Sequence, residues 1–337
     1  MPITTIGRLY GVKGETLRKI YKYKLSGYTE WEGMKRTRYA DIPYVSYPEN
    51  CGEYLSIDET SLSSDELYTI VTNKDAHGGP GTLVALLYGT KVSDITAVLE
   101  ESIPAWRRLK VKEITCDLSS AMMEAVRQSF PLADIVNDRF HVQQLFNEAM
   151  DDLRIDIRHQ VRKEEAELQE MCKEQGVEFA PIKYRNGETL PQILLRTKQA
   201  LMVSQDKWKP QQKARIEILF EHFPIMKQAY DVMQKLRCIF NQKVDHLKGG
   251  ALLMNWYKDV EALGRATFNT VVRTFKNNYK TITNYFKRRS TNASAESFNL
   301  KSRCSELSSE EWRILFSSYT DSSICSPEFL TLSIYEF

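Results

Sequence analysis

Between residues 54 and 136, short β-rich runs alternate with turn residues, and this segment constrains the fold more than any other. The first three runs follow each other closely, which predicts an antiparallel meander. The last two are separated by helical segments, which is typical of parallel strands. The order predicts an α/β fold with a mixed five-stranded sheet. The five runs are Tyr54–Thr60, Leu67–Thr72, Thr82–Tyr88, Val111–Asp117 and Ala133–Val136.

Two helices are expected between these strands. Ser93–Ser102 has a serine at its start that is suited to an N-cap. Ser119–Phe130 carries an apolar stripe at helical spacing. The glycine-rich turn at Gly78–Gly81 separates the second strand from the third. We therefore expect residues 51–140 to form the first part of a catalytic core.

From residue 141 to residue 279 the pattern is mostly helical and shows no fixed repeat period. We read this block as an insertion between the fifth strand and a final core segment at 280–303. The expected helices are Val142–Arg162, Leu190–Val203, Lys209–His222, Ile225–Phe240, Leu252–Leu263 and Thr267–Tyr279.

The first 28 residues are short and basic. Ile3–Tyr10, a turn at Gly11 and a second helix at Glu15–Lys22 fit the spacing of a helix-turn-helix. In that interpretation the cations of the second helix face DNA; a plain structural hairpin is the alternative. Residues 29–50 are interpreted as a linker. The cations are Arg18, Lys19 and Lys22.

The net charge of +2 is unevenly distributed. Between Ala262 and Arg303 there are nine Lys or Arg residues and one acid, Glu296. Such a block indicates a phosphate-bearing partner, although a solvated basic helix face is the plainer alternative. Within this block, Lys287, Arg288 and Arg289 are consecutive.

The six cysteines are far apart, and none forms a Cys-x-x-Cys pair. This argues against a zinc ribbon and for reduced thiols. No apolar run approaches the length of a membrane span. We therefore expect a cytoplasmic protein without a membrane partner.

Three carboxylates occupy positions in the sequence that suit metal ligands. Asp58 and Asp117 close apolar, strand-like runs, and Glu296 lies in the basic stretch. A carboxylate at a strand end can reach a metal without burying an unpaired charge. Three such groups can hold two Mg²⁺ about 4 Å apart for phosphodiester chemistry. Taken singly, each has a plainer reading as a turn former, a helix cap or a surface residue.

If residues 291–303 are helical, the spacing places four polar side chains on one face. This face would carry a metal ligand flanked by groups that hold DNA phosphates. His141, at the start of the helical block, is either a positioning group for DNA or a hydrogen-bonded histidine at a helix start. The four residues of the face are Asn292, Glu296, Asn299 and Arg303.

Several motifs together resemble the DDE transposases of bacterial insertion sequences, in the ISL-three group and its ISAon-type subgroup. They are Asp58-Glu-Thr, Asp117, the Asp138-Arg-Phe-His141 box and the Asn292-Ala-Ser-Ala-Glu296-Ser-Phe-Asn299 box. The resemblance covers roughly residues 10–301. The two boxes are fairly specific when they occur together.

The resemblance implies an RNase H-like core with a helical insertion before the last carboxylate. It implies that Asp58, Asp117 and Glu296 are the catalytic triad and bind two Mg²⁺ or Mn²⁺ ions. The expected partner is double-stranded DNA, both transposon ends and target, bound by a homo-oligomer near the bacterial nucleoid. The expected reaction is cleavage at the ends followed by attack of a 3′-OH on target DNA. The alternatives are an RNase H-like nuclease without strand transfer and an inactive DNA-binding remnant.

After residue 303 the sequence departs from the family pattern. Ser308–Ile314 can be read in another frame as text closer to that pattern. We hypothesise that the divergent tail at 304–337 is frameshifted, which the coding DNA decides.

Overall fold

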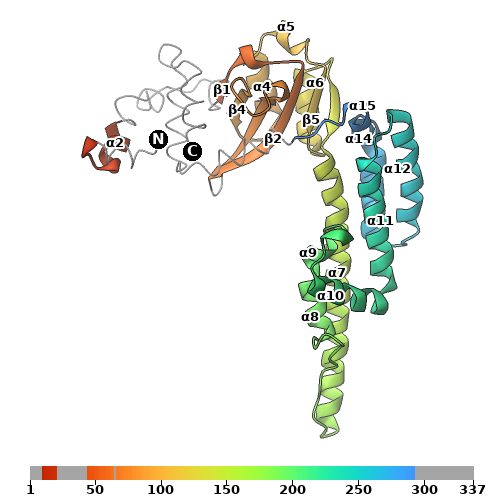
Figure 1. Cartoon of the computed structure of the whole chain (residues 1–337). Helices are drawn as coiled ribbons and strands as arrows, with labels where there is room; N and C mark the ends of the chain where they lie inside the picture. Colours follow the sequence, from red (N-terminus) through yellow and green to blue (C-terminus); the bar gives the residue numbers. More distant parts are fainter. Residues whose placement is uncertain (1–9, 21–43, 64–65, 293–337) are drawn as a thin grey trace. The chain divides into compact units, whose positions relative to one another are not determined.

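A computed structural model describes residues 10–20, 44–63 and 66–292 (Figure 1). The chain divides into two compact units. The first holds the described residues up to Asp138 together with residues 290–292, and the second is Arg139–Arg289.

The first unit is built on one six-stranded sheet in the order β1-β4-β3-β2-β5-β6. β2, β3 and β4 form the expected antiparallel meander, and β2–β5 and β5–β6 pair in parallel. The α/β class is confirmed, but the prediction of five strands was one short. The strands are β1 (Tyr44–Ser46), β2 (Tyr54–Ser63), β3 (Glu66–Asn73), β4 (Leu83–Tyr88), β5 (Glu113–Cys116) and β6 (Asp134–Asn137).

The additional strand, β1, comes from the end of the segment that we predicted as a linker. It is only three residues long, so it carries no recognisable periodicity. Val45 pairs with Leu86 of β4 and is buried in a small cluster with Tyr68 and Ile70. Tertiary packing therefore created a strand that local sequence could not indicate.

Helices α4 (Val92–Ser102) and α6 (Ser120–Ser129) pack on the sheet face that carries Leu55, Ile57 and Ile114. Alternation along a strand sends neighbouring side chains to opposite faces, so Ser56 and Asp58 point to the other face. A short helix, α5 (Ala105–Arg108), and two 3₁₀ turns, η2 (Pro48–Asn50) and η3 (Lys74–Ala76), complete this unit.

The two predicted helix starts had different outcomes. Ser119 is the N-cap of α6, and its side chain accepts a hydrogen bond from the Met122 N–H. The expected cap at Ser93 was wrong, because α4 begins at Val92 after Lys91. Ser93 lies inside the first turn, and its hydroxyl donates to the Asp94 carboxylate instead.

The regular elements of the second unit are all helices, with a non-helical connection between Glu174 and Leu190. Its first helix, α7 (Arg139–Glu174), is 36 residues long and extends beyond the predicted end at Arg162. The last buried side chain of α7 is Ile157. Beyond it, residues of high helix propensity continue the helix to Glu174, and Gly176, with a φ of +68°, follows its end. The other helices are α8 (Leu190–Arg196), α9 (Lys198–Leu201), η4 (Gln205–Lys207), α10 (Pro210–His222), α11 (Pro224–Asn241), α12 (His246–Glu261), α13 (Ala266–Asn277), α14 (Tyr279–Thr283) and α15 (Tyr285–Arg288).

The helix expected at Leu190–Val203 is divided at Thr197. The Thr197 hydroxyl donates to the carbonyls of Ile193 and Leu194. Such back-bonding by a threonine often bends a helix. Thr270 and Thr274 make the same bond inside the unbroken helix α13, so this bond alone does not account for the break.

An aromatic core holds the helices of the second unit together. Trp256 of α12 is fully buried, and its ring centroid lies 5.6 Å from Phe146 of α7 and 5.0 Å from Phe275 of α13. The Trp256 indole N–H donates to the Val232 carbonyl of α11 at 2.9 Å. One side chain of α12 thus contacts three other helices, which makes it central to the stability of this unit.

At the N-terminus the structure describes α2 (Gly14–Ile20), which carries Arg18 and Lys19. Gly11, with a φ of +65°, precedes it at the expected turn. The first helix of the predicted helix-turn-helix and Lys22 fall outside the described residues, apart from Tyr10. None of the helices described here is long and apolar enough to cross a membrane.

Candidate active site

Asp58 and the residue before Asp117 lie on neighbouring parallel strands. Ser56 of β2 is paired with Thr115 of β5. Asp58 lies two residues after Ser56, and Asp117 lies two residues after Thr115, in the same direction along the two strands. Neighbouring strands are about 4.8 Å apart, so the two carboxylates leave adjacent strands at the same level. The structure therefore brings together two residues that the sequence separates widely.

The backbone around each aspartate is fixed by hydrogen bonds. Asp58 is 8% exposed, and its Oδ1 accepts from the Glu59 N–H at 2.9 Å. The Asp117 carbonyl accepts from Asn137 Nδ2 at 2.9 Å. The Asp138 N–H donates to the Cys116 carbonyl at 2.9 Å. β6 therefore holds the turn through which β5 delivers Asp117.

Polar side chains continue from Asp58 along the same face. Ser56 and Thr115 are fully buried. Lys74, the first residue of η3, donates to Thr115 Oγ1 at 2.5 Å and to Glu113 Oε1 at 3.2 Å. Our sequence analysis missed these residues. Their signal was present, because polar and apolar residues alternate in both 54–58 and 113–117.

Negative charge is concentrated at this edge of the sheet. Burial, together with the nearby charge of Asp117, raises the pKa of the Glu59 carboxyl above its usual value. The charge of Asp117 makes ionisation of Glu59 less favourable, and a cation bound nearby would offset this repulsion. The edge is thus suited to hard cations with oxygen ligands.

The raised pKa of Glu59 gives a pH-dependent prediction. The folded state holds the Glu59 proton more tightly than the unfolded state, so the ionised carboxylate costs stability once the pH rises through the raised pKa. We expect Glu59→Gln to be more stable than the parent at pH 7, with the difference disappearing as the pH falls below 4.5. Thermal unfolding at a series of pH values measures this. A similar gain for the exposed control Glu101→Gln, or a gain independent of pH, would contradict it.

The third predicted carboxylate, Glu296, lies outside the described residues, as do Asn299 and Arg303. Asn292 is described and is fully buried in the first unit. It lies in a bend, and the residues just before it, from Arg289, are not helical. The predicted polar helix face therefore does not extend back through Asn292. Its burial also leaves it no surface for the predicted contact with a DNA phosphate.

The remaining predicted DNA contacts differ in their surroundings. Lys287 and Arg288 are exposed on α15. Arg289 instead contacts the end of α11, where its guanidinium donates to the carbonyls of Phe240 at 2.9 Å and Gln242 at 2.5 Å. His141, in the first turn of α7, is half-buried, and its ring packs nearly perpendicular to that of Phe140.

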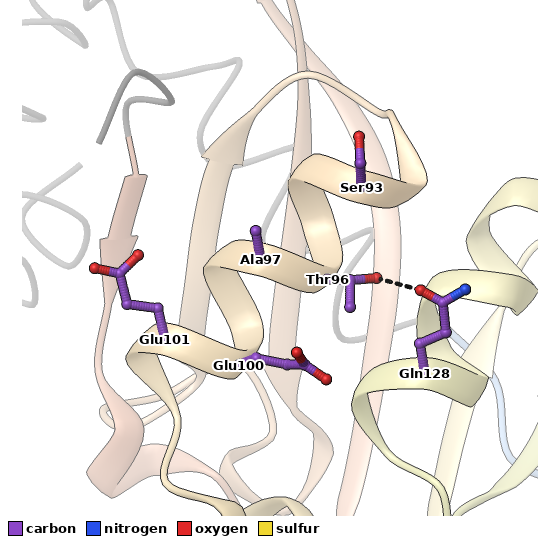
Figure 2. A pocket seen from close by; sticks show the side chains of 6 residues that line it. All are labelled: Ser93, Thr96, Ala97, Glu100, Glu101 and Gln128. Carbon is purple, nitrogen blue, oxygen red and sulfur yellow. Dashed lines mark hydrogen bonds between the residues drawn. The ribbon is translucent and has the colours of Figure 1, made fainter. Parts of the chain in front are cut away.

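A shallow depression of about 560 Å³ lies between α4 and α6 (Figure 2). Thr96 of α4 donates to Gln128 of α6 at 3.2 Å across it. Its lining contains Glu100 and Glu101 and no cation, so it would repel a phosphate. It is also formed by the helices that cover the face opposite Asp58, so it is separate from the aspartate pair.

Within residues 10–20, 44–63 and 66–292, no three His, Cys, Asp or Glu side chains are grouped closely enough to hold a metal. A family model described as a transposase matches residues 55–306, which is most of the chain and includes both aspartates. The chain belongs to the ISL-three group of DDE transposases. This family acts on DNA as a polynucleotidyl transferase and generally uses divalent metal ions.

The match to this transposase family ends at residue 306, close to the point where the tail departs from the family pattern. Comparisons with curated proteins and with solved structures give no significant match. The assignment of individual site residues in this transposase therefore depends on its own sequence and geometry.

Proposed function

We propose that this transposase cleaves DNA at the ends of an insertion sequence in a metal-dependent reaction and joins the resulting 3′-OH to target DNA. The observation that carries the proposal is the parallel pairing of Ser56 with Thr115, because Asp58 of β2 and Asp117, directly after β5, each follow two residues later. The order β4-β3-β2-β5-β6 also supports an RNase H-like core, because a three-stranded meander continues into two parallel strands.

The two aspartates would hold two Mg²⁺ or Mn²⁺ ions, with Glu296 as the third carboxylate. Bound there, the ions would activate the attacking oxygen and stabilise the leaving oxygen. Hydrogen bonds within the chain would fix the positions of these two ligands. The Glu59 N–H orients the Asp58 carboxylate, and Asn137 holds the turn that carries Asp117.

The DNA backbone would be held in part by the surface of α13–α15. No acid occurs between Glu261 and Glu296. Arg273, Lys280 and Lys287 are exposed on these helices, whereas Lys276 is paired with Glu261 at 2.6 Å. A surface of one sign attracts phosphates without reading sequence. Arg18, Lys19 and Lys22 would read the terminal repeats, and Arg288, Asn299, Arg303 and His141 would add contacts.

Removing cations from this surface should weaken DNA binding in a salt-dependent way. For Arg273→Ala combined with Lys280→Ala, we expect the slope of log K against log salt to fall by about one unit for each lost phosphate contact. Fluorescence anisotropy with duplex DNA at several salt concentrations measures the slope. Lys213→Ala removes an exposed cation of α10, beside Glu217 and Glu221, and should leave the slope unchanged. An equal effect of both changes would contradict the assignment.

The reaction itself is tested with a supercoiled plasmid that carries the gene and its flanking DNA. Mg²⁺-dependent nicking followed by joining to a second DNA supports the proposal. Nicking without joining would show an RNase H-like nuclease instead. DNA binding without nicking would show an inactive remnant. Because two ends must be processed, we also expect a homo-oligomer on DNA, which the mass of the DNA complex reports.

A further inference from the structure

Large apolar side chains gather on the surface at α5. Trp106 of α5 is 55% exposed, and Leu109, which follows the helix, is 48% exposed. The Asp134 N–H donates to the Lys112 carbonyl at 2.8 Å, which brings the turn before β6 next to the segment before β5. Leu132 lies in that turn and is 68% exposed. Apolar side chains that gather in this way mark an interaction surface, whereas single ones do not.

Two cations are held on the exposed Trp106 ring. The guanidinium carbon of Arg107 lies 4.6 Å from the ring centroid, and Lys110 Nζ lies 4.8 Å from it. Arg107 donates to the backbone carbonyl of Glu49 at 3.1 Å, and neither cation has a carboxylate partner among the described residues. Their charge is therefore left for an anionic partner. These two cations, with Trp106, Leu109 and Leu132, form what we call the α5 surface.

The depression between α4 and α6 has the opposite charge and borders α5. Arg108 of α5 connects the two, since its Nη1 lies 3.7 Å from Glu100 of α4 and donates to the Ser129 carbonyl of α6 at 2.8 Å. Glu100 and Glu101 are exposed on α4 (Figure 2). In the described part of the chain, Glu101 has no cation paired with it. A basic, aromatic surface and an acidic depression thus lie next to each other on one unit.

We propose that the α5 surface docks on the acidic depression of a second copy of this chain, so that two copies form a symmetric dimer. Adjacent patches of opposite charge complement themselves under a two-fold axis, because each copy offers its basic surface to the acidic depression of the other. The depression of about 560 Å³ would receive the Trp106 ring, and Lys110 would face Glu101. Tryptophan and arginine are the side chains that most often carry the affinity of such interfaces.

A protein partner suits the α5 surface better than DNA does. A phosphate backbone offers no apolar counterpart to three exposed apolar side chains, and Glu100 and Glu101 beside the surface would repel it. A protein interface combines apolar contacts at its centre with a polar rim. The inference deepens the homo-oligomer of the proposed function, on which it rests, by naming the surface through which two copies meet.

The test measures the mass of the full chain by sedimentation velocity over a range of concentrations, without DNA or metal. Lys110→Glu and Glu101→Lys should each raise the dissociation constant of the dimer at least about 10-fold, because like charges then face each other. An equal mixture of these two single variants should form dimers again. In the mixed dimer every glutamate at these positions faces a lysine, and a folding defect cannot produce such a recovery.

Two further variants complete the comparison. Trp106→Ala should also raise the dissociation constant at least about 10-fold, as expected for the loss of a central aromatic side chain. Lys213→Glu makes the same charge change as Lys110→Glu, but at an exposed position of α10 in the other unit, and should leave the dissociation constant unchanged.

Three results would overturn the inference. One is a mixture of the two charge variants that associates no better than either variant alone. Another is a Lys110→Glu chain that binds DNA more weakly and keeps the parent mass, which would make α5 a DNA surface. The third is a parent chain that is monomeric alone and dimeric only on DNA, which would leave the proposed function intact. A dimer that forms as expected but does not nick DNA would contradict the proposed function alone.

Discussion

Replacing Asp58 or Asp117 by asparagine is expected to lower the rate of Mg²⁺-dependent nicking by at least about 10³-fold, because each change removes several kcal/mol of stabilisation by a metal ion. Asparagine keeps the size of the side chain, and its amide oxygen can still accept the hydrogen bond that Glu59 donates to Asp58. The loss should therefore come from the missing charge. Initial rates on supercoiled plasmid measure it.

The control for this prediction is Asp152→Asn, the same change at an exposed position of α7 in the other unit. It should nick at the parent rate. Both active-site variants should still bind DNA at least as tightly as the parent without metal, since removing a carboxylate lowers repulsion of phosphate. If the nicking rate of either aspartate variant falls by less than tenfold while the protein still folds, that residue is not catalytic.

Replacing Trp256 by alanine is expected to cost about 3–5 kcal/mol of the stability of the second unit. The change empties the centre of the aromatic core, where Trp256 contacts Phe146 and Phe275. It also removes the hydrogen bond from the indole N–H to the half-buried Val232 carbonyl. For a unit of this size the melting transition should fall by roughly 6–20 °C. Differential scanning calorimetry resolves whether the transition that moves belongs to this unit.

Trp106→Ala is the matched control, because Trp106 lies on α5 of the first unit and is 55% exposed. Surface substitutions usually change stability by less than about 0.5 kcal/mol, although Arg107 and Lys110 stack on this ring. A shift of less than about 2 °C for Trp256→Ala would mean that neighbouring side chains collapse into the space. The core would then be less rigid than its packing indicates.

The sequence by itself determined the strands and helices whose patterns are long enough to read. The apolar, β-rich run Tyr54–Thr60 predicted a buried strand, and β2 is there, buried from Leu55 to Asp58. The apolar stripe of Ser119–Phe130 predicted a helix. The structure has α6 there, with Ser119 as its N-cap and Ser120 as its first residue. The aspartates could be singled out because each closes an apolar run, where a carboxylate can reach a metal without burying an unpaired charge. Family motifs then supplied the kind of reaction.

Only the tertiary structure decided which of these residues meet. The parallel pairing of β2 with β5 puts Asp58 and Asp117 each two residues beyond the paired Ser56 and Thr115, and no local pattern records a pairing over that distance. Asn292 and Arg289 were read as DNA-binding because both stand in a polar, basic stretch. Burial by Ser56 and Asp138 instead places Asn292 inside the core, and the open carbonyls of α11 engage Arg289. Sequence shows which groups a chain carries, whereas long-range packing decides which of them face solvent and which satisfy one another.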